Sequence, residues 1–226
     1  MGKEIEDIAL QRGHEIVFKS SSKLTDSSHG LELADVAIEF TRPDAAADNI
    51  LHCFEKKVPV VVGTTGWYQR LPEIKEVAYQ HNGTLLYSTN FSIGVNIVFH
   101  LNELLAKLMD KNGEYSASIT EIHHSQKLDK PSGTAITLAE GILANIAALK
   151  EWKLDIETME SVLPIHSERM GDVPGTHIIS YESDVDKIQI THEAKSRKGF
   201  ALGAVKAAEW LHGKNGVYTM KDFLKF

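Results

Sequence analysis

The sequence predicts an α/β fold whose first half is built on a parallel sheet and whose second half is an α+β structure. Helix-like and strand-like segments alternate through residue 90, which favours parallel strands joined by right-handed crossover helices. Beyond residue 90, a long amphipathic helix is followed by strand-like segments that include an antiparallel pair. These two patterns together predict the fold class.

The first half opens with an amphipathic helix that places Ile5, Ile8 and Ala9 on one face and ends at Gly13. The later apolar run VPVVVGTTG is of the kind buried in a parallel sheet. The predicted elements are a helix at 3–12, a strand at 14–18, a loop at 20–30, a strand at 34–41, a helix at 44–57, a strand at 58–66, a helix at 69–81 and a strand at 84–90.

The second half of the sequence has a different pattern, in which apolar and polar residues alternate as they do in half-buried strands. In the segment YSASITEIHH, Ile119 and Ile122 break the strict alternation. The predicted elements are a helix at 94–110, a strand at 115–124, a helix at 134–150 entered through Ser132 and Gly133, two antiparallel strands at 175–183 and 187–196, and a last helix at 200–213.

Composition limits the classes of function. The chain has 226 residues, 42% of them hydrophobic, enough for one large domain or two small ones with a substantial core. The net charge of −7 argues against a general affinity for nucleic acid or an anionic membrane, and no apolar run approaches a membrane span. Cys53 is the single cysteine, so an internal disulfide is excluded and Cys53 is expected to be a core thiol. The amphipathic, acid-bearing N-terminus is unlike a secretion signal, so we expect a cytoplasmic protein.

The beginning of the chain departs from the usual Rossmann-like pattern. Such a fold opens with a strand, a glycine-rich turn and then a helix, whereas this chain opens directly on the helix. If Gly2 is the last glycine of a G-x-G-x-x-G turn, the first strand and most of the phosphate cradle are missing, roughly a dozen residues. We then expect unpaired strand edges and weakened cofactor binding.

Polar residues follow three of the predicted parallel strands, at Phe40–Pro43, Gly63–Gly66 and Ser88–Phe91. Each group alone could be an ordinary loop. The carboxyl ends of parallel strands share one edge of the sheet, so three together favour a ligand cleft. Gly63 and Gly66 would let backbone amides approach a flat ring closely.

The stretch EIHHSQKLDKPSGTA at residues 121–135 holds the densest group of chemically active side chains. His123 and His124 are adjacent and would point to opposite faces of an extended strand, so they are poorly placed to bind one metal together. The chain lacks the histidine and cysteine spacings of zinc sites, so no metal is expected. A histidine is instead a plausible proton donor, and Lys127 would add positive charge or a second proton. The alternative is a solvated loop.

The predicted helix after this stretch offers an anion site. Ser132 precedes it, and the amides of Gly133 and Thr134 would be among its unpaired N-terminal donors. A carboxylate bound there would lie near the two histidines and the lysine. The stretch therefore predicts a site for a small, carboxylated, reducible molecule.

The same stretch resembles the signature of the 4-hydroxy-tetrahydrodipicolinate reductase (dihydrodipicolinate reductase) family. Further matching segments follow in the same order along nearly the whole chain. They are IEFTRPDA at 38–45, VVGTTGW at 61–67, NFSIGVN at 90–96, RMGDVPGTH at 169–177 and ITHEAKSRKGFALGAV at 190–205.

The resemblance implies an oxidoreductase of lysine and diaminopimelate biosynthesis that uses NADH or NADPH and no metal. It implies a dinucleotide-binding domain made of residues 1–91 and 201–226, and a domain at 92–200 for substrate binding and tetramerisation. The second domain would contain an open mixed sheet that joins a homotetramer. The substrate would be a small dicarboxylate.

The resemblance also implies residue roles. His123 and Lys127 would be catalytic proton donors, and Arg197, in the matching SRKGF segment, would support the site. The residues implied to bind substrate carboxylates are His124, Ser132, Gly133 and Thr134. The residues assigned to the cofactor are Gly2, from the turn discussed above, with Gly63, Thr64, Thr65, Ser88, Thr89, Asn90 and Phe91.

Two departures leave alternatives open. Without the glycine-rich turn, the chain could be a cofactor-binding-impaired form with little activity. Lys19, Ser20 and Ser21 stand where an acid would bind ribose hydroxyls, which favours the 2′-phosphate of NADPH unless this loop is merely solvated. A different class, a Schiff-base lyase with Lys127 as nucleophile, is less favoured because Lys127 lies among polar residues.

Overall fold

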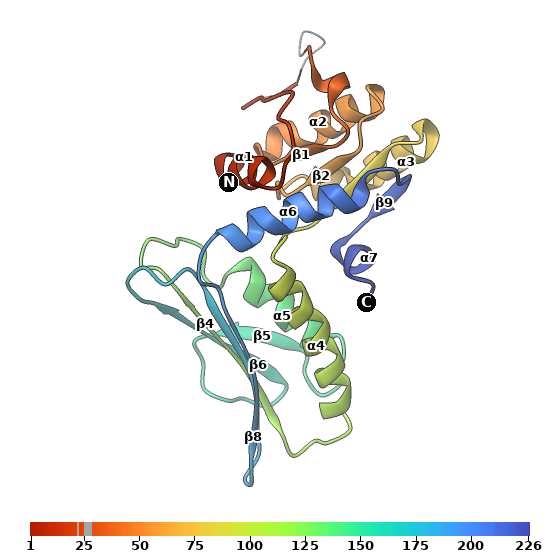
Figure 1. The fold of residues 1–226 in the computed structure, drawn as a ribbon. Coiled ribbons are helices and arrows are strands. Elements are labelled where there is room, and N and C mark those ends of the chain that lie inside the picture. Colours follow the sequence, from red (N-terminus) through yellow and green to blue (C-terminus); the bar gives the residue numbers. More distant parts are fainter. Residues whose placement is uncertain (22, 25–28) are drawn as a thin grey trace. The chain divides into compact units, whose positions relative to one another are not determined.

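The computed structural model describes residues 1–21, 23–24 and 29–226 (Figure 1). The chain divides into two compact units, Met1–Ile93 with Lys198–Phe226, and Gly94–Arg197. One unit holds a parallel sheet and the other a mixed sheet, so the predicted fold class is confirmed. The loop predicted at 20–30 lies partly outside the described residues. Within those residues, no helix is both long enough and apolar enough to cross a membrane.

The first unit is built on a parallel sheet of four short strands. The strands, in their order across the sheet, are β1 (Ala37–Glu39), β2 (Val60–Val62), β3 (Thr84–Tyr87) and β9 (Gly216–Tyr218). Successive side chains point to opposite faces, so Val60 and Val62 enter one core while Val61 enters the other. Burial on both faces explains why this strand is an uninterrupted apolar run.

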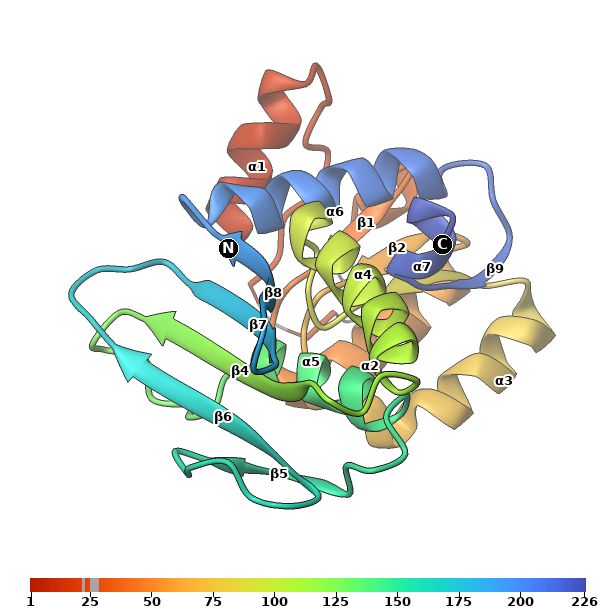
Figure 2. The same ribbon diagram turned by 90° about the horizontal axis from the view of Figure 1, so that it is seen from below.

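Helices cover both faces of this sheet, as Figures 1 and 2 show. The helices on one face are α1 (Gly2–Gln11), α6 (Lys198–Leu211) and the short α7 (Met220–Leu224), and those on the other are α2 (Pro43–Glu55) and α3 (Leu71–His81). Short 3₁₀ turns lie at Leu31–Leu33 and Tyr68–Arg70. Cys53 is buried in the core beneath α2, as predicted.

The prediction of a strand at residues 14–18 is wrong. These residues have no regular structure, although Ile16 packs into the core under α1 and α6, and Phe18 into the core under α2 and α3. An extended segment becomes a strand only when a neighbouring strand takes its backbone hydrogen bonds. Among the described residues, β1 pairs only with β2, and no ladder reaches residues 14–18.

Gly203 lets α6 pack closely on the loop after β3. A Cβ atom at this position would lie 1.7 Å from the carbonyl oxygen of Phe91. We expect Gly203→Ala to destabilise the protein by about 1–3 kcal/mol, since backbone must move to relieve this overlap. In the control Gly199→Ala, the nearest atom, Ser92 Oγ, is 3.9 Å away. Urea unfolding of both variants tests the prediction, and equal stability would contradict it.

The second unit is a mixed sheet with helices on one face. The strands, in their order across the sheet, are β5 (Glu151–Leu154), β6 (Val162–Arg169), β4 (Ser116–His123), β7 (Thr176–Glu182) and β8 (Lys187–Glu193). The first three are parallel, and β7 and β8 run antiparallel to their neighbours. The helices α4 (Ile93–Met109) and α5 (Gly133–Leu143) pack on the core face.

Several boundaries differ from the prediction. The helix predicted at 134–150 ends at Leu143, since the N–H of Ala147 donates to the Asp110 carboxylate (2.7 Å) instead of continuing the helix. Strands β5, β6 and β9 were not predicted. In β6, Pro164 conceals the strand pattern, because proline is rarely found inside a sheet.

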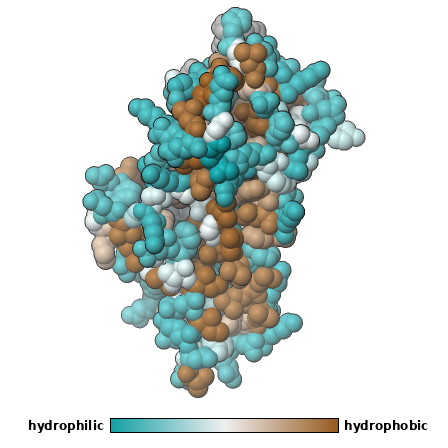
Figure 3. Space-filling model, viewed as in Figure 1, coloured by the Kyte–Doolittle hydropathy of each residue, from teal (hydrophilic) through white to brown (hydrophobic). Residues whose placement is uncertain are grey.

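An apolar stripe runs along the outer side of α4. Ile97, Leu101, Leu104 and Leu108 follow helical spacing and are 41–62% exposed. Figure 3 shows hydrophobic side chains gathered on this face over α4.

Candidate active site

Strand β4 carries the site because it buries polar side chains on its core face. Ile119, Glu121 and His123 point to this face, and Ile122 points to the other. The apparent break in alternation between Ile119 and Ile122 is therefore the normal strand period. Glu121 is fully buried, and His123 is 7% exposed at the end of the strand.

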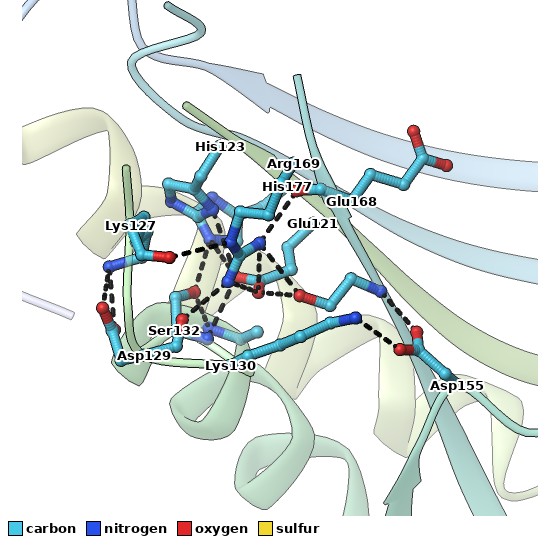
Figure 4. Close-up of polar contacts among 12 residues, drawn as sticks. Glu121, His123, Lys127, Asp129, Lys130, Ser132, Asp155, Glu168, Arg169 and His177 are labelled. Atoms are coloured by element: carbon cyan, nitrogen blue, oxygen red, sulfur yellow. Dashed lines mark hydrogen bonds and ion pairs between the residues drawn. The ribbon is translucent and has the colours of Figure 1, made fainter. Parts of the chain in front are cut away.

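The neighbouring strands bring further polar residues beside these two. Ser167 on β6 and His177 on β7 lie in register with Glu121 from either side, and Arg169 on β6 lies in register with His123. Figure 4 shows the side chains of His123, Arg169 and His177 gathered around Glu121. The sheet register thus assembles a buried polar cluster from three strands.

The Glu121 carboxylate is the centre of this cluster. Its Oε1 accepts hydrogen bonds from Ser167 Oγ (2.5 Å) and from both terminal nitrogens of Arg169 (3.2 Å each). Its Oε2 accepts from the Ser132 N–H (3.1 Å) and lies 3.3 Å from His123 Nδ1. Burial raises the pKa of Glu121, but interactions with His123, Ser132 and Ser167 outweigh burial and hold the pKa well below its ordinary value. Glu121 is therefore a carboxylate at neutral pH.

His177 is the neutral partner in the cluster. Burial, followed by the nearby His123, lowers the pKa of His177 to about 3. Its Nε2 lies 3.1 Å from Ser132 Oγ, and its ring meets the His123 ring edge-on with the two centroids 5.1 Å apart. His177 therefore stays uncharged at neutral pH.

The loop after β4 carries Lys127. Its Nζ lies 2.7 Å from both carboxylate oxygens of Asp129, and Lys130 Nζ lies 2.6 Å from Asp155 Oδ2. The predicted candidate His124 begins this loop and is half-buried, and its carbonyl accepts from the Lys127 N–H (3.1 Å). The peptide bond between Lys130 and Pro131 is cis.

The start of α5 closes the site opposite this loop. Ser132 is its N-cap, and Ser132 Oγ accepts from the Ala135 N–H (3.2 Å). Gly133 and Thr134 are the first two helical residues, and a Cβ at Gly133 would meet no atom within 4 Å. Exposed amides at a helix N-terminus attract anions. The structure thus brings His123, Ser132 and the start of α5 together around Glu121.

In the first unit, the ends of β1 and β2 form a cavity of about 230 Å³. It is lined by Phe40, Thr41, Pro43, Gly63, Thr64 and Thr65. A Cβ at Gly63 would lie 2.1 Å from the end of the Phe40 ring, so any larger residue would have to move that ring. Thr64 Oγ1 is buried and has no hydrogen-bond partner among the described residues. A flat ring bearing an amide fits these features.

The remaining predicted cofactor residues lie elsewhere in the first unit. Ser88, Thr89, Asn90 and Phe91 follow β3, the neighbour of β2, and Ser88 Oγ donates to the Asn90 carbonyl (2.8 Å). Gly2 is the first residue of α1, whose N-terminus has no side-chain cap. Ser88–Phe91 and Gly2 do not line the cavity described above.

Arg197 lies in neither region. It is exposed and follows β8 at the boundary of the second unit. Its predicted supporting role stays a prediction.

Glu121, His123 and His177 could also hold a metal ion. Each offers one ligand atom, and the three atoms lie within 4.8 Å of one another. However, Arg169 already compensates the charge of Glu121, and Ser132 already bonds His177. A cation at Oε2 would meet a carboxylate whose charge is already compensated through Oε1, and it would have to displace Ser132 from His177. A histidine–carboxylate arrangement therefore explains the cluster better than a metal centre.

Sequence reasoning missed Glu121, Ser167, Arg169 and His177. Glu121 opens the stretch at 121–135, while Arg169 and His177 are the two ends of the segment RMGDVPGTH. Only strand register brings them together, and β6 was not predicted. The rule that apolar side chains face the core also assigns Glu121 to the wrong face.

The low pKa of His177 predicts that acid lowers the stability of the folded protein. In the folded state the group titrates far below its ordinary pKa of 6.5, so its contribution to stability is complete above about pH 6.5 and is lost as the pH falls. Glu121 adds a similar loss only at lower pH, below its ordinary value of 4.5. Between about pH 6.5 and 5, the shifted pKa of His177 should by itself lower the free energy of unfolding by about 2 kcal/mol.

The variant His177→Gln tests this prediction, because an amide can still bond Ser132 and cannot titrate. Urea unfolding at about pH 7 and about pH 5 should show a smaller loss of stability in the variant than in the parent. The pKa of His192 is also lowered by burial, so His192 contributes the same loss of stability on acidification to the parent and to the variant. An equal loss of stability between the two pH values in parent and variant would show that His177 is not the acid-sensitive group.

Comparison with known proteins agrees with this architecture. A parallel-sheet unit and a mixed-sheet unit with a buried histidine–carboxylate cluster define a two-unit α/β protein. The structure of dipicolinate-bound dihydrodipicolinate reductase from Paenisporosarcina sp. TG-14 superposes with a TM-score of 0.78 at 22% identity, covering 96% of this chain and 92% of that one. At this identity the likeness shows the fold alone.

Sequence comparison identifies the family. The profile described as dihydrodipicolinate reductase, N-terminus, matches residues 1–91, and the C-terminus profile matches residues 94–224. The 4-hydroxy-tetrahydrodipicolinate reductase of Christiangramia forsetii is 51% identical over 99% of this chain and 93% of its own length. The enzyme of the same name from Neisseria meningitidis serogroup B is 34% identical over 97% and 83%. The chain belongs to the dihydrodipicolinate reductase family, and the resemblance stated from its motifs is confirmed.

Proposed function

We infer that this chain is an oxidoreductase that reduces 4-hydroxy-tetrahydrodipicolinate to tetrahydrodipicolinate with NADH or NADPH, in lysine and diaminopimelate biosynthesis. The observation that carries this function is the 51% identity to a reductase of that name across 99% of the chain. Neither the cofactor-binding-impaired form nor the Schiff-base lyase is favoured by this relationship.

The substrate site lies in the second unit in this proposal. The Gly133 and Thr134 amides, Ser132 and the His124 side chain bind the carboxylates, which is chemistry suited to a helix N-terminus. The Paenisporosarcina enzyme, which has the same fold, is described with dipicolinate, a flat dicarboxylate, bound.

The residues His123 and Lys127 provide the protons. The cyclic hydroxy-diacid loses water to give a conjugated imine, and the reduced nicotinamide, when bound, supplies a hydride to it. The electrons pushed into the ring then require a proton, which His123 with Lys127 delivers. His123, held beside a carboxylate, can carry this proton, and Lys127 keeps a positive charge near the substrate.

The first unit holds the cofactor in this proposal. The 230 Å³ cavity with Gly63, Thr64 and Thr65 takes the nicotinamide ring. Ser88–Phe91, which follow the neighbouring strand β3, are assigned to the same cofactor. Gly2 at the start of α1 is assigned to the phosphates. The domains are then residues 1–91 with 201–226 for the dinucleotide, and 92–200 for substrate and assembly.

The choice between the two nucleotides rests on the segment at Lys19, Ser20 and Ser21. Lys19 is exposed, and although it pairs with Glu6 at 2.8 Å, an exposed ion pair is weak enough for a 2′-phosphate to replace the carboxylate. This favours NADPH over NADH.

We also infer a cytoplasmic homotetramer. The helices α4 and α5 cover one face of the mixed sheet, and its other face would join subunits. Sedimentation of the purified protein measures the number of subunits directly.

The first experiment measures oxidation of NADPH and NADH by the purified protein, with substrate made in situ by the preceding synthase. Loss of absorbance of the reduced nucleotide that depends on the synthase product supports the proposal. A version extended at its N-terminus by a strand and a G-x-G-x-x-G turn is run in parallel. Activity only in the extended version would mean that residues 1–226 alone bind the cofactor poorly, and no activity in either version would overturn the reductase function.

A further inference from the structure

Glu121 lies between two imidazole rings, and only one of them can donate a proton to it. Glu121 Oε2 lies 3.3 Å from His123 Nδ1 and 3.9 Å from His177 Nε2. Since Glu121 is ionised, it needs a donor on this oxygen in addition to the Ser132 N–H.

His177 is not that donor, because its Nε2 lies 3.9 Å from Oε2, beyond hydrogen-bond distance, and 3.1 Å from Ser132 Oγ. His123 Nδ1 is closer to Oε2 and has no other hydrogen-bond partner among the described residues. His123 Nδ1 is therefore the imidazole nitrogen placed to donate to Oε2.

The contact between Glu121 and His123 is nearly formed. The 3.3 Å separation lies just beyond an ordinary hydrogen bond, and the direction of Nδ1 leaves the bond incomplete. A small rotation of the ring completes it. Acid–base contacts of this kind are often loose before the substrate binds.

Gly175 places no side chain against the opposite ring nitrogen of His123. Gly175, in the turn before β7, has φ +152, and a Cβ built there would lie 3.0 Å from His123 Nε2. Glycine at this position leaves that edge of the ring accessible to a small molecule.

Arg169 connects the same carboxylate to the loop of Lys127. While both of its terminal nitrogens bond Glu121 Oε1, its Nη2 also donates to the Asp129 carbonyl (2.6 Å) and its Nε to the Lys127 carbonyl (3.4 Å). Figure 4 shows this guanidinium lying between the loop and Glu121. One buried ion pair thus holds the strand, the loop and the start of α5.

We propose that Glu121 is a positioning residue that keeps the proton of neutral His123 on Nδ1, so that Nε2 is the nitrogen that exchanges a proton with the substrate, and that Arg169 holds the Lys127 loop against the same carboxylate. This inference rests on the proposed function, in which His123 is the proton donor. Such a carboxylate orients the ring and stabilises the imidazolium, without touching the substrate.

The tautomer can be measured in the parent protein. In ¹⁵N-histidine-labelled protein at alkaline pH, with the His123 signal assigned by the His123→Asn variant, Nδ1 should carry the proton. A proton on Nε2 would overturn the proposal. This measurement does not depend on activity, so it is distinct from a failure of the reductase function, which would appear as inactivity of the parent enzyme.

The variant Glu121→Gln tests the consequence for catalysis. We expect kcat to fall about 10–100-fold with a smaller change in KM, since the effect is on proton transfer rather than on binding the dicarboxylate. The limb of the pH profile that belongs to His123 should move to lower pH, because the imidazolium loses its negative neighbour. The other charged or titratable groups around this ring are Arg169 on β6, His177 on β7 and Lys127 on the loop, and the variant leaves all three in place.

The control is Glu168→Gln, which removes the same charge one residue from Arg169. The Glu168 side chain is exposed and points away from the cluster (Figure 4). Its kcat and pH profile should match those of the parent. A pH limb that stays in place in Glu121→Gln, with kcat reduced only in proportion to lost stability, would show that Glu121 is merely structural and would overturn the proposal. If Glu121→Gln does not fold, the tautomer measurement decides.

Discussion

Replacing His123 by asparagine is expected to lower kcat by about 10²–10⁴-fold, the range in which a positioned general acid contributes. Asparagine can still donate a hydrogen bond toward Glu121 Oε2, so the buried carboxylate keeps a partner and the fold should survive. KM should change less than kcat, because the carboxylates of the substrate are assigned to other groups. Steady-state kinetics with saturating nucleotide measure both constants.

Two further variants make this result specific. His124→Asn removes the adjacent imidazole, which is assigned to a substrate carboxylate, and should mainly raise KM. His81→Asn changes an exposed histidine in the last turn of α3 and should change neither constant. If His124→Asn caused the larger fall in kcat, the two neighbouring histidines would have to exchange roles.

Strands β1, β2 and β3 of the parallel sheet were readily predicted because their signal is local, whereas β9 of the same sheet was not predicted. Strands buried on both faces are continuous apolar runs, so Val60–Val62 and Leu85 with Leu86 stand out in the sequence. The segment at 14–18 looks the same to such a rule. It fails there because pairing, which needs a second strand, is not a property of the segment itself.

The polar cluster could not be predicted in the same way. His123, Lys127 and the start of α5 lie within one stretch of sequence, and their types indicate acid–base chemistry and anion binding. Glu121 is placed beside Ser167 and Arg169 only by the register of β4 with β6, and β6 contains the misleading Pro164. Local patterns thus identify the reactive side chains, whereas the residues that hold them depend on long-range pairing.

Replacing Lys127 by methionine is expected to lower kcat/KM by about 10²–10³-fold, because both a proton source and a positive charge beside the substrate are lost. Methionine keeps an unbranched side chain of similar length. Lys127 is less exposed than its neighbour Lys130, 21% against 41% of the side chain, and it faces Asp129 at 2.7 Å. Partial burial strengthens its interaction with a bound anion.

The matched control is Lys130→Met, which removes the same charge from the same loop. Lys130 pairs with Asp155 at 2.6 Å, away from the Lys127–Asp129 pair, so activity should change by less than about threefold, as expected for an exposed ion pair. Treatment of the parent enzyme with borohydride and a keto acid should leave it unmodified, because the reductase forms no Schiff base. Lysine at 127 would be the nucleophile of a lyase only if this treatment trapped a covalent adduct that Lys127→Met could not form. Equal losses of kcat/KM in the two methionine variants would instead mean that the loop contributes only its net charge, and the proton would then have to come from His123 alone.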